Sequence, residues 1–581
     1  MRLILAAALL ASAASQSCAS APAQAGVAGD YLGGRLAAHF NAVDDAARIY
    51  SDAHRAAPGE IALLRDAFFY QLVSGDIDGA ALLACAMIAA RPKEEEDGLA
   101  RLTLAAADLR LGKLEGARAS LTSEMSAPFF KAVALIANAW IEKELKGPIA
   151  GVGKLDRPPT DPLGVFDPLH KALMNEEAGR LDDARAAYQV AILGAGGPIS
   201  RRGYGAFLER AGDVNAARDY YAQLAVNEGA GRRAAKSASR RIAAGRPPAY
   251  FTNLGAAEGA AIAYYSLAQV MIEQAAEQRE RAELAGFHVG DPRFNMPLAL
   301  ARLALHLDPE LEEARRLVGH ILLAYGDYAD GAEILSRIPA SSPHFEQARL
   351  DMARGLAALE DMKGAERVLV GAIRRDPEGQ ALKGALANLY AAEGDHGQAV
   401  KLLNALIEGI ADPPEDDAWQ LYIARGAALL EMDDWDAAEA DLKRAVEAAP
   451  DEAQALNYLG YSWAERGINL EEAFRLIEKA VELRPDSGAI VDSLGWAHYQ
   501  LGRYAEAVGH LEKAATLEPD DPTITDHLGD VYWRLGRDIE ARYEWRRGLD
   551  LDPPAKLKEQ LERKITEGLE DRARQSADDG A

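Results

Sequence analysis

The C-terminal part of the chain repeats one sequence pattern at a nearly fixed interval. The segment VDSLGWAHYQLGRYAEAVGHLEKAATLEPDDP is followed directly by ITDHLGDVYWRLGRDIEARYEWRRGLDLDPP. Gly460, Gly495 and Gly529 lie 35 and 34 residues apart in successive copies, and a proline follows each copy at the same step. A period of about 34 residues, with small residues and proline at fixed offsets, is typical of a helix–turn–helix repeat. Because a chain of 581 residues is too long for one compact core, this period favours a repeat array.

Each recurring residue type has a physical role in such a unit. The glycine in the first helix and an alanine in the second, such as Ala507, let two antiparallel helices approach closely. Proline ends the second helix because it cannot continue one. The turn between the two helices carries the motif LGR, with Gly502 and Gly536. The aspartates after the prolines are predicted to cap the next helix: Asp451, Asp486 and either Asp520 or Asp521.

With these features the sequence resembles the tetratricopeptide repeat (TPR) family. Related segments recur along the chain, from AHFNAVDDAARIYSDAHRAAP at 38–58 to GAALLEMDDWDAAEADLKRAVEAAP at 426–450. The resemblance covers most of residues 31–553. It implies an all-α fold, a right-handed superhelical α-solenoid of about 12–13 TPR hairpins.

Two interruptions of the period divide the predicted array. Residues 146–168 are rich in glycine and proline and are predicted to form an inserted loop. A basic stretch ends at Pro247 and Pro248, after which a long helical pattern restarts, so we place a border between two arrays there. The predicted organisation is a signal peptide at 1–25, an N-terminal array at 26–245, a Pro-containing linker at 246–255, a C-terminal array at 256–560 and a polar tail at 561–581.

The N-terminal residues have the pattern of a secretory signal. Arg2 is followed by an apolar run over residues 3–14 and then by small residues. Cleavage after Ala25 fits the small-x-small rule, whereas cleavage before Cys18 would leave that cysteine to carry a lipid anchor. The residues before Cys18, SQS, lack the aliphatic residue usual in lipoprotein signals. The other cysteine, Cys85, lies in an apolar helical pattern and is predicted to be a small core residue, so no intrachain disulfide is expected.

Charge and motifs argue against several kinds of function. The 90 acidic and 64 basic side chains leave a formal charge of −26, which would repel the phosphates of a nucleic acid. GVGKL at 151–155 lacks the first glycine and the Ser or Thr of a phosphate-binding loop. The histidines are scattered, and His498, His510 and His527 are predicted to have packing or surface roles rather than to bind metal. We therefore expect no catalytic constellation, no metal site and no cofactor.

The remaining candidate is a binding surface on the first helices of the last repeats. In a TPR array these helices line the concave face, which holds a partner segment. An amide or carboxylate at one offset in three consecutive repeats would bond a peptide backbone, and aromatic rings one turn later would add apolar contact. The alternative is that the polar residues only link neighbouring helices and that the rings pack between hairpins. The predicted peptide-binding groove consists of Asn457, Tyr461, Asp492, Trp496, Tyr499, Asp526, Asp530 and Trp533.

Beyond the general family, the leader, the long array and the segment LGYSWAERGINLEEAFRLIEKAVELRPDSGAIVDSLGWAHYQLGRYAEA resemble the exported envelope TPR proteins of Gram-negative bacteria. That group includes outer-membrane lipoproteins that bring substrates to proteases or to peptidoglycan enzymes. The resemblance implies a noncatalytic adaptor in the periplasm that binds envelope proteins or peptides. It would be attached to the outer membrane if Cys18 is lipidated. Two other functions stay open: a structural part of a secretion or pilus machine, and the substrate-binding array of an enzyme. Self-association also stays open.

Overall fold

The computed structural model describes residues 27–569, apart from short gaps. The gaps are residues 91–96, 123–124, 126, 158–161, 195–196, 228, 247, 249, 285–293 and 409–417. The predicted signal peptide and Cys18 therefore lie outside the described residues, as does most of the predicted polar tail. Within the described residues the chain forms helices and no strands, and the predicted all-α fold is confirmed.

The helices form two compact units, which divide after Arg375. The first unit contains α2 (Val27–His39), α3 (Val43–Ala56), α4 (Ile61–Ser74), α5 (Ile77–Ala90), α6 (Gly98–Arg110), α7 (Leu114–Ser120), α8 (Pro128–Lys146), α9 (Pro148–Lys154), η1 (Pro162–Phe166), α10 (Asp167–Glu177), α11 (Leu181–Ala191), α12 (Gly197–Arg210), α13 (Val214–Asn227), α14 (Gly229–Ala243), α15 (Ala256–Leu284), α16 (Asn295–Leu307), α17 (Glu312–Ala324), α18 (Tyr328–Ser336), α19 (Phe345–Ala358) and α20 (Met362–Arg375). The second unit contains α21 (Gln380–Ala392), α22 (His396–Ile407), α23 (Trp419–Glu431), α24 (Trp435–Ala448), α25 (Ala453–Glu465), α26 (Leu470–Leu483), α27 (Gly488–Gln500), α28 (Tyr504–Leu517), α29 (Pro522–Arg534), α30 (Asp538–Asp550) and α31 (Ala555–Glu567).

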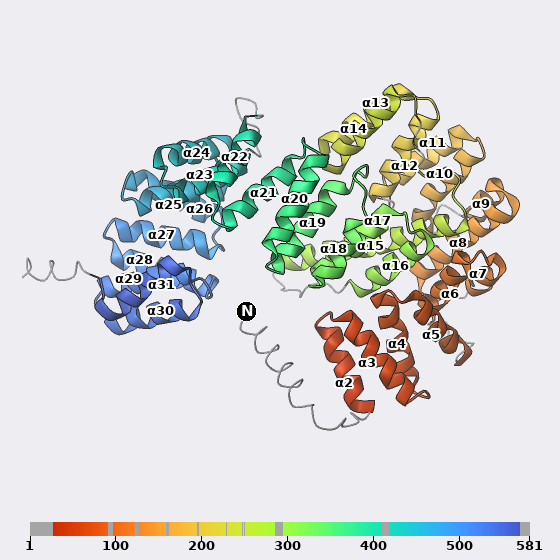
Figure 1. The fold of residues 1–581 in the computed structure, drawn as a ribbon, viewed down its shortest axis with the longest axis horizontal. Helices are drawn as coiled ribbons and strands as arrows, with labels where there is room; N and C mark the ends of the chain where they lie inside the picture. The colour runs from red at the N-terminus through yellow and green to blue at the C-terminus, as the bar shows by residue number, and fades with distance from the viewer. Residues whose placement is uncertain are drawn as a thin grey trace, which may run out of the picture. The chain divides into compact units, whose positions relative to one another are not determined.

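In the second unit, consecutive helices pair as hairpins from α21 and α22 to α29 and α30, and α31 packs against α30 (Figure 1). The repeat glycines have the role that the sequence predicts. A Cβ atom added at Gly460 or Gly495 would lie 2.6 Å from Ile477 or Leu511 of the second helix, and at Gly529 it would lie 2.4 Å from Trp545. Such a contact is too short for a side chain, so glycine allows the two helices to approach.

The turns and caps agree with the prediction in part. Gly502 and Gly536 adopt φ values of 74° and 79°, which glycine adopts without steric cost. Asp521 caps α29, because its side chain accepts hydrogen bonds from the backbone of Thr523 and Ile524. The predicted caps Asp451 and Asp486 are wrong. The residue that caps α25 is Glu452, whose side chain accepts a hydrogen bond from the backbone of Gln454, and α27 has no side-chain cap.

In the first unit, the first helices α4, α6 and α8 are covered by other helices of the same unit. The long helix α15 packs against α8 and α6, and α16 packs against α4, α5 and α6 (Figure 1). Gly259 of α15 lies directly on the Trp140 ring, and the hydroxyl of Tyr264 donates a 2.8 Å hydrogen bond to the Leu102 carbonyl. These contacts join segments that lie more than one hundred residues apart, which no repeat period predicts.

Three predictions about organisation are corrected. The described part of residues 246–255 is no border, because Tyr250 and Leu254 are bonded inside the first unit to Glu313 and Lys143. The segment 146–168 is not a simple loop, since it contains the short helices α9 and η1. Cys85 is exposed rather than part of the core, because the buried face of α5 is formed by other residues. Among the described helices, none is both long enough and apolar enough to span a bilayer.

Candidate functional site

All eight residues of the predicted groove lie on the first helices of the last three hairpins. Asn457 and Tyr461 lie on α25, whereas α27 and α29 carry the other six. α25 packs against α27, and α27 against α29. We call the side of α25, α27 and α29 that carries these residues the inner face. The structure places the eight residues as follows: Asn457 and Tyr461 on α25; Asp492, Trp496 and Tyr499 on α27; Asp526, Asp530 and Trp533 on α29.

Aromatic rings form a continuous stack across the inner face. The Trp496 ring stacks on Tyr499, with ring centroids 4.6 Å apart, and on His527 at 4.0 Å. The Tyr461 ring lies 6.5 Å from the same histidine. His527, which we predicted to have a packing or surface role, thus connects rings from all three helices. Stacked rings fix one another in place and give a rigid apolar surface.

The carboxylate of Asp492 pairs with a histidine of the next first helix, α29. Nδ1 of His527 lies 3.0 Å from Oδ1 and 2.9 Å from Oδ2 of Asp492, and both side chains are buried. Burial alone would lower the pKa of His527, but the charge and hydrogen bond of Asp492, together with the charges of Asp526 and Asp530, outweigh burial and raise it. Asp492 therefore holds the histidine ring of the stack and links α27 to α29.

Asp526 and Asp530 form ion pairs with the last helix, α31. Nζ of Lys564 lies 2.7 Å from a carboxylate oxygen of Asp526 and 2.8 Å from one of Asp530. The indole N–H of Trp545 also donates a 3.0 Å hydrogen bond to Asp530. A Cβ atom at Gly568 would lie 2.1 Å from the Trp533 ring, so the chain after α31 covers this ring. These contacts agree with the alternative that these acidic residues link neighbouring helices.

Two polar atoms of the inner face have no such partner. Within the described residues, Oδ1 of Asn457 and Nε1 of Trp496 are buried and make no hydrogen bond. A buried polar atom without a partner costs about 1–3 kcal/mol, so a native structure retains one for a reason. One atom is an acceptor and the other a donor, which is what the N–H and C=O groups of a peptide require. Tyr461 and Tyr499 are partly exposed beside them, although the Tyr499 hydroxyl accepts a hydrogen bond from Arg534.

The charge of Asp530 makes the α29–α31 contact dependent on pH. Burial and the neighbouring Asp526 raise the pKa of Asp530 to about 6, against the opposing effect of Lys564. The folded state thus holds this proton more tightly than the unfolded chain, so the folded state loses stability as pH rises from about 4 to about 6. The Asp530→Asn variant removes this pH-dependent loss of stability. As pH rises from about 4 to about 6, we expect the stability of the variant relative to the parent to increase by roughly 2–3 kcal/mol, which raises its relative melting temperature.

Thermal melts of both chains across this pH range measure the difference. The exposed Asp520→Asn is the matched control, with no change expected. A difference between Asp530→Asn and the parent that stays constant with pH would show that Asp530 has an ordinary pKa.

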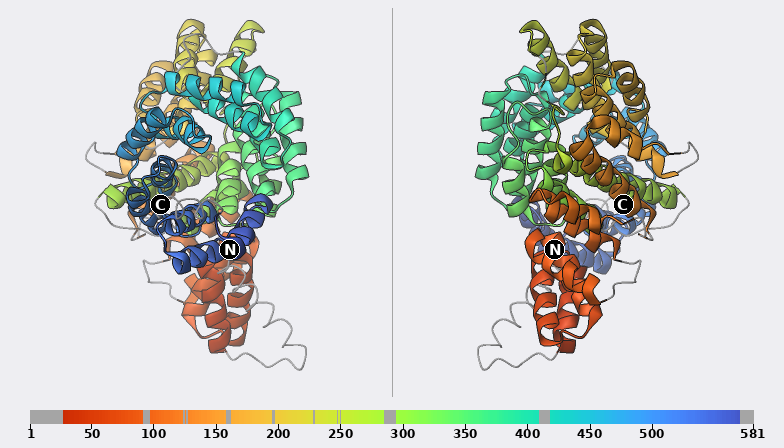
Figure 2. Two further views of the ribbon diagram at one scale, coloured as in Figure 1. Left: turned by 90° about the vertical axis from the view of Figure 1, so that its left-hand side faces the viewer. Right: turned by 90° about the vertical axis from the view of Figure 1, so that its right-hand side faces the viewer.

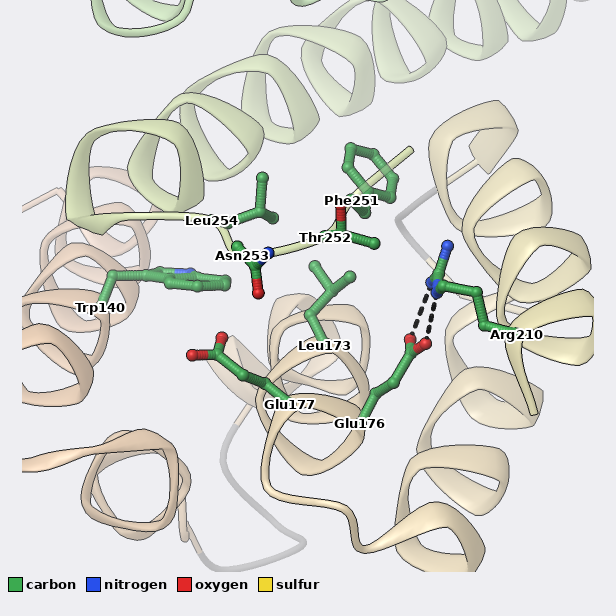
Figure 3. Close-up of a pocket in the computed structure, with 9 residues that line it drawn as sticks. All are labelled: Trp140, Leu173, Glu176, Glu177, Arg210, Phe251, Thr252, Asn253 and Leu254. Carbon is green, nitrogen blue, oxygen red and sulfur yellow. Dashed lines mark hydrogen bonds and ion pairs between the residues drawn. The ribbon is translucent and has the colours of Figure 1, made fainter. Parts of the chain in front are cut away.

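The first unit contains a cavity of about 160 Å³ that the sequence did not predict. Figure 3 shows Trp140, Leu173 and Leu254 beside the glutamates of α10. Its lining comes from four separate parts of the chain: Trp140; Leu173, Glu176 and Glu177; Arg210; and residues 251–254. Because the period describes only neighbouring hairpins, no sequence signal joins these segments.

The charges in this cavity are already balanced. Glu176 pairs with Arg210, with Nε and Oε1 2.6 Å apart (Figure 3). Glu177 pairs with Lys143 at 2.9 Å. The lining of the cavity therefore combines apolar side chains with charged side chains that are already paired.

One cluster of carboxylates has the spacing of cation ligands. Oxygen atoms of Asp44, Asp327 and Asp330 lie within 4.8 Å of one another. Burial raises the pKa of Asp44, and the positive charge of Arg302 beside the cluster opposes this rise. Asp327 also caps α18. The arginine and the cap account for these residues, and we assign no metal to them.

The stacked hairpins with small residues at their crossings define a helical-repeat protein. Family models described as "Tetratricopeptide repeat" match residues 350–416 and 423–488, and one described as "TPR repeat" matches 495–536. Residues 350–416, 423–488 and 495–536 are therefore tetratricopeptide repeats, as the sequence indicated.

Known proteins share parts of the array. "TPR repeat-containing protein PA4667" of Pseudomonas aeruginosa is 38% identical over 120 residues, which are 21% of this chain and 20% of that protein. Human "Protein O-mannosyl-transferase TMTC1" is 25% identical over 179 residues, which are 30% of this chain and 20% of that protein. This chain thus spans about a fifth of the length of each relative. The crystal structure of the APC/C hetero-tetramer Cut9–Hcn1 aligns with a TM-score of 0.37 and 15% identity, covering 88% of this chain and 97% of that chain.

Proposed function

We propose that this protein is a noncatalytic adaptor of the bacterial cell envelope that binds an extended segment of a partner protein on the inner face of α25, α27 and α29. TPR arrays serve in general as protein–protein interaction scaffolds. An adaptor of this kind acts by geometry, because holding two proteins together raises their effective concentration. The partners are envelope proteins, and they include a protease or a peptidoglycan enzyme together with its substrate.

The observation that carries this proposal is the pair of unpartnered buried atoms, Oδ1 of Asn457 and Nε1 of Trp496. The side chains that hold them are partly exposed beside the stacked rings, where a bound peptide gains apolar contact and, by reaching these atoms, backbone hydrogen bonds. The rest of the predicted groove plays a supporting part. Asp492 positions the His527 ring, and Lys564 neutralises Asp526 and Asp530.

The first unit supports placing the site in the second. Its helices α4, α6 and α8, which occupy the position of first helices in their hairpins, are covered by α15 and α16. A partner segment would have to displace buried residues such as Tyr264 to reach them. No described helix of the second unit covers α25 and α27 in this way. The main packing contact of α31 is with α30 of the last hairpin.

Asn457→Leu tests the proposal, because a binding role and a folding role predict opposite results. Leucine has a similar volume and no unsatisfied oxygen, so we expect the free energy of unfolding to stay the same or to rise by about 1 kcal/mol. Binding of the partner, in contrast, should fall by about tenfold, since one hydrogen bond in a desolvated site is lost. The measurements are a denaturant melt and quantitative capture of envelope proteins on the immobilised chain.

Gln398→Leu is the matched control, because it makes the same kind of change at an exposed position of α22. Trp496→Phe is a second probe, which keeps the ring stack and removes the N–H. Capture of the same proteins in equal amounts by the parent, Asn457→Leu and Trp496→Phe would reject the inner face as the site. A variant that loses both stability and binding would assign Asn457 to folding.

A further inference from the structure

The first described helix, α2, and the residue that follows it expose three large apolar side chains. Leu32 and Leu36 of α2, and Phe40 directly after the helix ends at His39, are spaced by four residues and are 66%, 59% and 62% exposed. The fully buried residues of α2 are small, Gly34 and Ala38, and Tyr31 packs partly buried beside the Tyr50 ring of α3. A Cβ atom at Gly34 would lie 2.9 Å from the same ring, so the α2 backbone lies directly on α3 there. Figure 1 and Figure 2 show α2 at the edge of the first unit, with its outer side uncovered by other described helices of that unit.

This arrangement is the reverse of what solubility requires. Terminal repeats of a solenoid need a polar outer face, and a surface helix normally directs its large apolar residues to the core. Three exposed residues on one stripe therefore indicate a surface that contacts something else.

The charges between these residues favour an anionic contact. Arg35 and His39 lie on the same exposed side of α2, whereas the acidic residue Asp30 is only partly exposed. The whole chain carries a formal charge of −26, so a basic and apolar helix face is unusual in it. Large apolar residues flanked by basic ones are typical of helices that lie in the interface of a lipid bilayer.

The size of the face argues against a second copy as its partner. A helix of 13 residues is about 20 Å long, and one side of it buries a few hundred Å² at most. A stable protein interface buries roughly 800 Å² on each partner. A membrane sets no such minimum, because other parts of the chain add to the binding.

The residues before α2 supply such a part. Cleavage of the leader before Cys18 would leave that cysteine in place as the candidate for lipidation. Val27 is nine positions after Cys18, and a fully extended chain of that length spans about 30 Å. Any attachment of this segment to a bilayer would hold α2 close to the lipid surface.

We propose that the outer face of α2 docks on an anionic lipid bilayer, with Leu32, Leu36 and Phe40 among the acyl chains and Arg35 among the headgroups. The inference does not depend on the partner-binding role of the second unit. It gives the first unit a fixed contact with the membrane at α2.

The test uses the full chain with a reporter in the helix. α2 contains no tryptophan, so the Leu36→Trp variant adds one at the proposed contact. With vesicles of phosphatidylglycerol and phosphatidylcholine that carry brominated acyl chains, we expect this tryptophan to be quenched relative to the parent. The matched control is Ile539→Trp, at a position of α30 that is 84% exposed in a similar apolar stripe. Quenching should be absent there.

A second measurement reads affinity. Replacing Leu32, Leu36 and Phe40 by serine should lower partition into the same vesicles by about tenfold, whereas replacing Leu535, Ile539 and Tyr543 should leave it unchanged. Arg35→Glu should reduce binding only when phosphatidylglycerol is present. Absence of quenching at position 36 would overturn the proposal even if the chain binds vesicles through its leader. So would a dimer mass in light scattering without lipid that the serine variant loses, because the face would then bind a second copy.

Discussion

We expect Glu313→Ala to cost the first unit about 3 kcal/mol, because Arg202 loses its nearer carboxylate and keeps only Glu312, 3.4 Å away. Glu313 is buried at the start of α17, where Arg202 of α12 donates a 3.0 Å hydrogen bond to it. The Tyr250 hydroxyl donates a second bond of 2.6 Å. One carboxylate thus ties the segment before α15 and two helices of the array to one another.

The pKa of Glu313 reports the strength of these contacts. Burial would raise it, but Arg202 and His344 outweigh burial and hold it well below the ordinary value. A lowered carboxyl pKa stabilises the fold above the unfolded value of 4.5, and this contribution is lost as pH falls through the folded pKa.

Hydrogen exchange is the appropriate measurement, because a repeat array need not unfold in one step. In Glu313→Ala, the free energy that protects the α12 and α17 amides from exchange should fall by the amount expected for the loss of stability. Glu310→Ala, three residues earlier and exposed, should change it by less than about 0.5 kcal/mol. Equal protection in the two variants would show that the buried cluster is not what holds the segment.

The second large effect is expected where α15 lies on α8. A Cβ atom at Gly259 would lie 1.9 Å from the Trp140 ring, so Gly259→Leu must push the two helices apart. Overpacking of this kind costs about 1–3 kcal/mol or more. Trp140→Ala should cost about 3–5 kcal/mol, because the ring is fully buried and its N–H donates a 2.9 Å hydrogen bond to His170.

The double variant gives the decisive comparison. Leucine at 259 enters the space that Trp140→Ala leaves, so Gly259→Leu and Trp140→Ala together should cost less than the sum of the two single changes. Thermal or denaturant melts of the four chains measure the coupling. Additive costs would mean that α15 does not rest on α8, and the first helices of the first unit would then be accessible to a partner.

The sequence predicted features that depend on neighbouring hairpins. Gly460, Gly495 and Gly529 mark helix crossings because each contact recurs with the period. Gly502 and Gly536 mark the turns for the same reason, since a left-handed backbone is needed at one fixed place in each unit.

The sequence did not predict the contacts between distant segments. The bonds of Tyr250 to Glu313 and of Tyr264 to Leu102 connect parts of the chain that no motif relates, so the border at 246–255 was predicted wrongly. The groove residues were placed on the correct helices, but their partners were not foreseen. Asp492 was predicted to face a ligand and His527 to have a packing or surface role, and nothing in the sequence shows that these two residues, 35 positions apart, form a pair.

The most direct test of the central claim is site-specific photo-crosslinking from the inner face. A photoreactive phenylalanine analogue replaces Tyr461 on α25 in one chain and the exposed Glu478 on α26 in another, and both are irradiated with envelope extract. We predict an adduct with a discrete envelope protein from position 461, lost when Asn457→Leu is added, and none from position 478. An adduct from position 478 alone, or one from position 461 that Asn457→Leu leaves intact, would contradict the assignment of the inner face as the partner-binding surface.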